Sequence, residues 1–155
     1  MRETLFNWLA PTLPGARCLD LFAGSGALGL EALSRGAASV TFVDRDRAAL
    51  RRIDEHLGTL GAQHAQTWCG DWQAFVGQSD GPFDVIFADP PFASDYLSQL
   101  CTLLAASGTL ATDGRLYLEF SRSQELEITA PWAIHRRGHA GQVGYALLKL
   151  SATSE

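Results

Sequence analysis

Short runs of strand-forming residues alternate with amphipathic segments along this chain. The runs predict buried strands at 18–22, 39–43, 63–69, 83–88 and 115–120. Helices are predicted at 2–9, 27–35 and 94–106, after Asp46 to about Leu57, and in a short stretch that ends at Val76. Two final strands, 132–136 and 144–150, are expected to pair across a loop that contains Gly138 and Gly141. The alternation predicts a three-layer α/β fold with a mostly parallel sheet and a closing antiparallel hairpin.

Length and composition limit the class of protein. Residues 1–155 are expected to form one domain, in which residues 1–14 are an N-terminal helix and linker. A hydrophobic content of 46% with 19% charged residues indicates a soluble globular protein. The sequence has no signal-peptide pattern and no apolar run near the roughly 20 residues of a membrane span, which predicts a cytoplasmic protein. The cysteines at 18, 69 and 101 lack metal-like spacing, so we expect reduced core residues and no metal site.

Net charge bears on the partner. A formal charge of −5 argues against a protein that grips nucleic acid over a broad face. Basic residues are nevertheless clustered at 45–52 and at 136–139. The first cluster is either the solvated face of a helix or a patch that binds phosphate. Charge alone leaves the partner open.

Three glycines mark the boundary between the first predicted strand and the helix that follows it. Gly24 and Gly26 let the backbone turn sharply and approach a ligand, and Gly29 lets the helix and strand pack closely. Their spacing matches a dinucleotide-binding fingerprint, which alone is weak evidence. We expect this loop, including Phe22 and Ser25, to contact a cofactor.

Asp20 narrows the choice of cofactor. It ends the strand a few residues before the helix N-terminus, where its carboxylate would repel a bound pyrophosphate. A cationic ligand suits this position, and S-adenosylmethionine carries an ammonium and a sulfonium but no phosphate. The sequence therefore favours a methyl donor over a nicotinamide dinucleotide. The alternative is that Asp20 caps the turn or the helix.

Acidic residues also follow the second and third predicted strands. Asp44 lies about 20 residues after the first loop glycine, where an acid accepts hydrogen bonds from ribose hydroxyls. We expect Asp44 and its neighbour Arg45 at the cofactor, although Asp44 or Asp46 would also serve as the N-cap of the next helix. Asp71 would accept a hydrogen bond from the adenine amino group, with Trp72 near the ring. An N-cap Asp followed by a core Trp is the alternative for this pair.

The stretch Asp89-Pro90-Pro91-Phe92 follows the fourth predicted strand, at the edge where an open α/β sheet binds ligands. Two consecutive prolines remove two amide donors, so the segment offers acceptors only: the Asp89 carboxylate and the Pro90 carbonyl. Acceptors suit the exocyclic amine of a nucleobase, with Phe92 stacked on the base. They would turn the nitrogen lone pair toward the methyl carbon, and Asp89 would take up the proton. A plain proline-rich turn is the alternative.

Guanine suits an acceptor-only site better than adenine does. Its N2 amine lies beside an N1–H, so it presents two adjacent donors, whereas the adenine amine lies beside an acceptor. The sequence therefore favours methylation of guanine N2. The alternatives are an adenine-N6 methyltransferase that acts on DNA or RNA, a cofactor-binding module with impaired catalysis, and a nicotinamide oxidoreductase.

Four segments, at 2–9, 20–31, 89–92 and 141–145, together resemble the bacterial 16S ribosomal RNA guanine-N2 methyltransferases of the RsmD type. The N-terminal Arg-Glu-Thr-Leu-Phe-Asn motif is the most specific of them. The resemblance implies a Rossmann-like class I methyltransferase fold, S-adenosylmethionine as the donor and a small-subunit rRNA guanine as the acceptor. It implies a catalytic site at 89–92, and a cofactor site lined by Asp20, Gly24, Gly26, Asp44 and Asp71.

Members of that family usually carry a further N-terminal segment, often basic, ahead of the helix at which this chain begins. The segment is expected to help cover the cofactor and hold RNA. We therefore expect either a truncated chain or one that binds RNA with help from elsewhere. The expected partner is ribosomal RNA or the assembling small ribosomal subunit, and the expected oligomeric state is a monomer.

Overall fold

A single mixed sheet forms the centre of the computed structural model, which describes residues 2–78, 81–89, 96–122 and 128–151. Within these residues the sheet has seven strands in the order β3-β2-β1-β4-β5-β7-β6. Strands β1 to β5 run parallel, and β7 runs antiparallel to both of its neighbours. This confirms the predicted α/β class and its closing hairpin. The strands are β1 (Arg17–Asp20), β2 (Ser39–Asp44), β3 (Ala65–Cys69), β4 (Phe83–Ala88), β5 (Leu110–Ser121), β6 (Trp132–Ala140) and β7 (Val143–Leu150).

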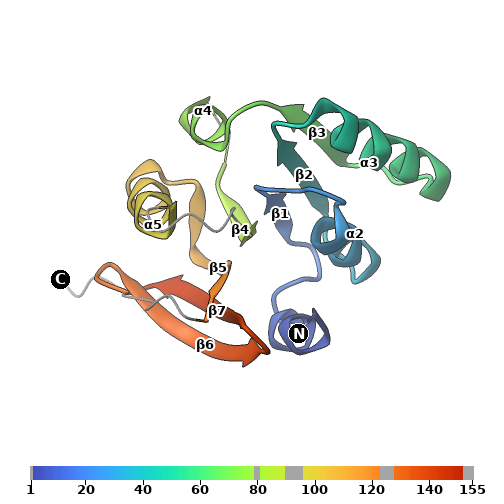
Figure 1. The fold of residues 1–155 in the computed structure, drawn as a ribbon. Helices are drawn as coiled ribbons and strands as arrows, with labels where there is room; N and C mark the ends of the chain where they lie inside the picture. Colours follow the sequence, from blue (N-terminus) through green and yellow to red (C-terminus); the bar gives the residue numbers. More distant parts are fainter. Residues whose placement is uncertain (1, 79–80, 90–95, 123–127, 152–155) are drawn as a thin grey trace.

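Helices cover both faces of the sheet (Figure 1). Two hydrophobic clusters of buried residues lie on opposite faces of the sheet. Leu19 and Ile86 belong to one cluster, and their strand neighbours Cys18 and Val85 belong to the other. Strands covered on both faces are apolar at nearly every position, which explains the short continuous runs in the sequence. No helix in the described ranges is long and apolar enough to cross a membrane. On one face lie α1 (Arg2–Leu9), α2 (Ala27–Ser34) and α3 (Arg47–Leu60), and on the other lie α4 (Trp72–Gln78) and α5 (Tyr96–Ser107).

Several boundaries differ from those that the sequence predicts. β1 ends at Asp20, two residues early, and β5 already begins at Leu110. β6 runs on to Ala140, so Gly138 lies within a strand and not in the hairpin loop. Gly138 pairs with Tyr145, and a Cβ there would lie 2.9 Å from the tyrosine ring. Position 138 therefore needs a glycine because the two strands pack closely there. The sequence prediction treated this glycine as a residue that ends a strand.

The N-cap of α3 is one of the two residues that the sequence offers for it. Asp46 is the N-cap of α3, and its carboxylate accepts hydrogen bonds from the amides of Ala48 and Ala49 at 2.9 and 3.3 Å. Helix α2 ends at a C-cap formed by Arg35, and Gly36 follows it with φ at +102°. Asp46 thus has a structural role that satisfies free amides at the start of α3.

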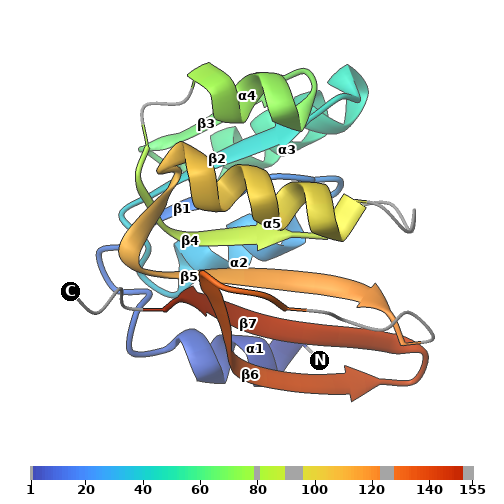
Figure 2. The same ribbon diagram turned by 90° about the vertical axis from the view of Figure 1, so that its left-hand side faces the viewer.

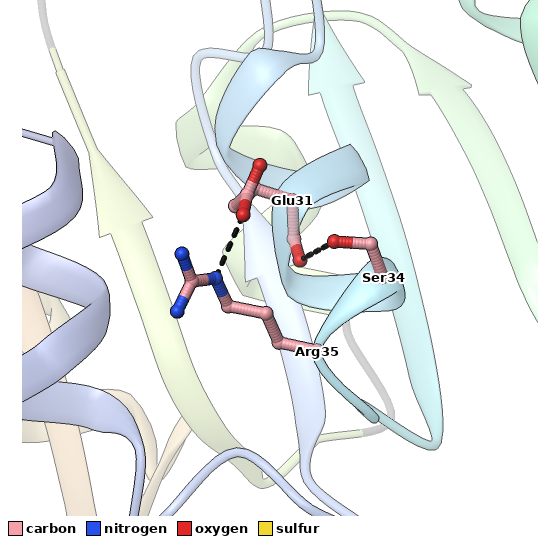
Figure 3. A network of polar contacts seen from close by, with 3 residues as sticks. All are labelled: Glu31, Ser34 and Arg35. Atoms are coloured by element: carbon pink, nitrogen blue, oxygen red, sulfur yellow. Dashed lines mark hydrogen bonds and ion pairs between the residues drawn. The ribbon is translucent and has the colours of Figure 1, made fainter.

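Helix α1 is held against the rest of the molecule by its apolar face and by α2. Leu5, Phe6 and Leu9 are fully buried. The guanidinium of Arg35 lies 5.1 Å from the centre of the Phe6 ring, and its Nε donates to Glu31 at 2.7 Å (Figure 3). The two residues are four apart in the sequence, a spacing that brings opposite charges together on a helix surface. In Figure 2, α1 lies next to β7, and the ring centres of Trp8 and Tyr145 are 5.5 Å apart, so the N-terminal helix has a fixed place beside the sheet.

Gly29 lets α2 approach β2. A Cβ at this position would lie 2.4 Å from Phe42 Cε1 and 2.9 Å from Val40 Cγ1. Both partners are buried ring or branched side chains of β2, which leaves little room for adjustment. The close helix–strand packing expected from the third glycine of the motif is therefore present.

Gly29→Ala should lower the free energy of unfolding by about 1–3 kcal/mol, because the added methyl overpacks this contact. Gly58→Ala is the matched control, since Gly58 is also helical and a Cβ there would meet nothing within 4 Å. It should raise stability by about 0.5–1 kcal/mol. Urea unfolding measures both variants. Equal changes in the free energy of unfolding would show that helix propensity alone determines both effects. The packing of Gly29 against β2 would then have room for a methyl group.

Candidate active site

The strand register brings the carboxyl ends of three neighbouring strands together. Asp20 at the end of β1 pairs with Phe87 of β4, and Ala88 pairs with Leu118 of β5. Asp20, Asp89 and Glu119 lie at or next to these paired positions, so the three acids meet at one edge of the sheet. They border a cavity of about 330 Å³. Its lining is Arg2, Asp20, Phe22, Ala23, Gly24, Ser25, Ala27, Leu28, Asp89, Tyr117 and Glu119.

Asp20 is 3% exposed, and its carboxylate accepts one hydrogen bond, from the amide of Gly29 to Oδ2 at 3.1 Å. Gly29 lies in the first turn of α2, so Asp20 does stabilise that helix, as the capping alternative requires. No hydrogen bond from another described residue reaches Oδ1. Burial raises the pKa of Asp20 to about 7, the charges of Asp89 and Asp44 add to the rise, and the bond from Gly29 opposes it.

The loop after β1 has a backbone that only glycine adopts readily. Gly24 and Gly26 have φ of +54° and +80°. A Cβ on Gly26 would also lie 2.9 Å from Ile53 Cγ1, whereas at Gly24 the space beyond the backbone is open. Gly26 is the N-cap of α2 and carries no side-chain cap, so the buried Asp20 of β1 acts in its place. The loop and the helix start therefore form one unit that borders the cavity.

Asp44 connects β2 to this loop. Its Oδ2 accepts from the amide of Gly24 and its Oδ1 from the amide of Asp46, both at 2.8 Å. An ionised carboxylate accepts about four hydrogen bonds, so each oxygen keeps the capacity for another. The bond to Gly24 lies outside what the sequence reasoning considered. It fixes the acid beside the turn, in a position compatible with the predicted contact to a ribose.

Several predicted cofactor residues are not part of the cavity lining. Arg45 is exposed after β2, and Asp71 immediately precedes α4. Trp72 is 4% exposed and packs in the core with its ring centre 6.1 Å from that of Phe22. This position is the one that the core-Trp alternative requires. Arg45, Asp71 and Trp72 do not line the cavity that contains Asp20 and Asp89, and neither do Asp44 and Gly26.

Asp89 is the one member of the predicted catalytic segment that the structure describes, and Pro90, Pro91 and Phe92 lie outside the described residues. It follows β4 and lines the cavity. Partial burial raises its pKa to about 6, and the negative charge of Glu119 adds to the rise. Asp89 therefore has a carboxylate neighbour that the sequence did not assign to the site.

Glu119 and Tyr117 of β5 complete this wall of the cavity. The Tyr117 hydroxyl donates to Glu119 Oε2 at 2.7 Å, and Tyr117 is 1% exposed. Burial and the adjacent carboxylates raise the tyrosine pKa far above its usual range, so it stays a donor. The sequence signal was an acid at the carboxyl end of an apolar strand, the same signal that singled out Asp20. It becomes decisive only when β5 is known to pair with β4.

Three carboxylates of the described residues therefore line the cavity: Asp20, Asp89 and Glu119. The charges that act on Asp20 come from Asp89 and Asp44, and the charge that acts on Asp89 comes from Glu119. Like charges gathered in this way oppose one another's ionisation. A ligand with positive charge would relieve the repulsion, whereas a phosphate would add to it. No group of three or more potential metal ligands occurs among the described residues.

A family model described as "Conserved hypothetical protein 95" matches residues 1–149. The chain belongs to this family. It is 44% identical to the ribosomal RNA small subunit methyltransferase D of Escherichia coli over 156 residues, which cover all of this chain and 79% of that protein. It is 38% identical to a putative rRNA methyltransferase of Bacillus subtilis, across 96% of this chain and 84% of that protein. The RsmD-type resemblance predicted from the sequence is thereby confirmed.

The fold of this family member is also found in solved structures. A putative methyltransferase from Escherichia coli superimposes with a TM-score of 0.91 at 43% identity, and the match covers 98% of this chain and 84% of that one. A putative methylase from Haemophilus influenzae gives 0.88 at 35% identity, covering 97% and 96%. These matches confirm a Rossmann-like class I methyltransferase fold.

Asp20→Asn should make the protein more stable, and increasingly so as pH rises. Folding raises the pKa of Asp20 from about 3.8 to about 7. Ionisation of Asp20 therefore destabilises the folded state by an amount that grows between pH 3.8 and pH 7 and is complete above pH 7. Asparagine keeps an acceptor for the Gly29 amide without the charge. Because one pKa unit corresponds to about 1.4 kcal/mol, the gain should be larger at pH 8 than at pH 5 by about 2–3 kcal/mol.

Urea unfolding at the two pH values measures this gain. The exposed Asp113 supplies the control Asp113→Asn, whose effect should be small and the same at both. A gain from Asp20→Asn that does not change with pH would contradict the buried, uncompensated carboxylate.

Proposed function

We propose that this protein transfers a methyl group from S-adenosylmethionine to the exocyclic N2 of a guanine in small-subunit ribosomal RNA. The observation that carries the proposal is the acidic cavity between the glycine loop and Asp89. The rRNA methyltransferases to which the chain is similar support the class of substrate. The proposal includes a single domain, 1–155, that acts as a monomer on ribosomal RNA or the assembling subunit in the cytoplasm.

The residues around the cavity fit this methyl donor. Asp20 is buried, keeps one oxygen without a hydrogen bond from the described residues, and has other acids as its charged neighbours. An ammonium or sulfonium beside it would favour its ionised form. The pyrophosphate of a nicotinamide dinucleotide would instead bring negative charge to the same place. S-adenosylmethionine, when bound, supplies a methyl group that a nitrogen can attack.

The adenosine part of the donor would lie toward β2 and β3. Asp44 would accept hydrogen bonds from the ribose hydroxyls with the acceptor capacity that Gly24 and Asp46 leave. Asp71 would accept from the adenine amino group. Arg45 and Trp72 belong to the same proposal, Trp72 as a buried support under this end of the site.

Asp89 would orient and deprotonate the guanine amine. With a pKa of about 6, it is mostly ionised at neutral pH and accepts hydrogen bonds only. A hydrogen bond from N2–H would hold the amine so that its lone pair points toward the donor methyl. As the new C–N bond would form and the bond from the methyl carbon to the donor sulfur would break, the amine would become acidic and Asp89 would take its proton. Pro90 would add a second acceptor through its carbonyl, on the stiff segment that Pro91 continues, and Phe92 would stack on the base.

Incubation with labelled donor and small-subunit rRNA, naked or in assembled subunits, should label guanine N2. Asp89→Ala should reduce turnover by about 10²–10⁴-fold while the affinity for the donor stays nearly unchanged, because Asp89 acts on the amine. Asp113→Ala on the exposed surface should leave both unchanged. Digestion to nucleosides followed by mass spectrometry identifies the product. Label on adenine N6, or an Asp89→Ala variant that no longer binds donor, would contradict the assignment.

Glu119→Gln should move the acidic limb of the pH–rate profile to lower pH. In the unaltered protein, turnover should rise with pH as Asp89 ionises near pH 6. Glutamine removes the negative charge that raises this pKa, and its amide oxygen still accepts from the Tyr117 hydroxyl. Single-turnover rates from pH 5 to pH 8 measure the shift. An acidic limb at the same pH in both proteins would show that it does not report Asp89.

A further inference from the structure

Among the residues that the structure describes, one positively charged side chain lines the cavity. Arg2, the first residue of α1, lines the cavity together with the acids Asp20, Asp89 and Glu119. Helix α1 is held there by fully buried side chains and by its contact with α2. The packing of α1 therefore fixes its position, and this places Arg2 at a site whose acids are distant from it in the sequence.

Arg2 does not neutralise the described acids of the cavity. Arg2 forms no ion pair within the described ranges, in which the ion pair is the one between Arg35 and Glu31. The charges acting on Asp20 and Asp89 are those of other carboxylates, and both pKa values are raised. A guanidinium placed against these carboxylates would have lowered them. The cavity thus keeps separate negative and positive parts, each without its counter-charge.

A ligand group that carries both charges matches this lining. The methionyl end of S-adenosylmethionine has an α-ammonium and an α-carboxylate on the same carbon. We propose that Arg2 binds this carboxylate while the ammonium lies on the acidic side of the cavity near Asp20. The inference rests on the proposed function and adds a cofactor contact from α1. Guanidinium suits the task, because its planar donors bind a carboxylate in a bidentate way and stay charged.

Two other roles for Arg2 make different predictions. If Arg2 only offsets the repulsion among the acids, its removal would affect every cationic ligand of the cavity alike. If it contacts an RNA phosphate, its removal would weaken RNA binding and leave the donor affinity unchanged. Binding of the donor carboxylate is distinguished from both, because its effect depends on whether the ligand has that carboxylate.

The test compares S-adenosylmethionine with decarboxylated S-adenosylmethionine, which keeps the adenosine, sulfonium and ammonium. Calorimetry on the full chain should show that Arg2→Ala weakens binding of the complete donor on the order of 10- to 100-fold, as expected for a charged hydrogen bond. Binding of the decarboxylated donor should be unchanged. Arg2→Lys should recover part of the loss. Arg52→Ala, at an exposed position of α3, should alter neither affinity.

Thermal unfolding of each variant shows whether the fold is retained. Equal loss for both donors, or no loss for either, would overturn the role of Arg2. Weaker RNA binding at unchanged donor affinity would assign Arg2 to the nucleic acid and also overturn it. If the unaltered chain binds neither donor, the proposed function itself fails, which is a different result from a normal donor affinity in Arg2→Ala.

Discussion

Repulsion among carboxylates at the ends of β1, β4 and β5 is the constraint on which the site depends. Parallel pairing brings Asp20, Asp89 and Glu119 to one edge of the sheet, and no described cation pairs with them. Such an arrangement opposes ionisation and is tolerated because Gly29 and Tyr117 each donate one hydrogen bond to it. The same constraint selects a ligand, because a cation relieves the repulsion and an anion increases it.

The fold was largely predictable because both faces of the sheet are covered. That coverage makes the strands continuous apolar runs, and β4 occupies the predicted range 83–88. Asp46 was recognisable as a cap because its partners lie two and three residues away. Gly138 was misplaced in the loop because the ring that excludes a side chain there belongs to Tyr145, on the neighbouring strand. The cap could thus be predicted from neighbouring residues, whereas the reason for Gly138 depends on a residue of another strand.

The same division explains the site. Asp20 and Asp44 were found from their places at strand ends, with capping as an alternative for each, yet the sequence did not identify Gly29 and Gly24 as the amides that donate to them. These bonds give each acid a structural role in the glycine loop together with the proposed ligand contact. Glu119 and Arg2 were missed because only the pairing of β5 with β4, and the docking of α1, bring them to the cavity.

Proton exchange during donor binding tests the central claim most directly. Calorimetric titration with S-adenosylmethionine at pH 6.5, in buffers of different ionisation enthalpy, counts the protons exchanged. Because Asp20 has a pKa of about 7 in the free protein, a cationic donor should expel its proton, and Asp20→Asn should release fewer. Binding without proton release, or no binding at all, would contradict an acid placed to receive a positively charged ligand.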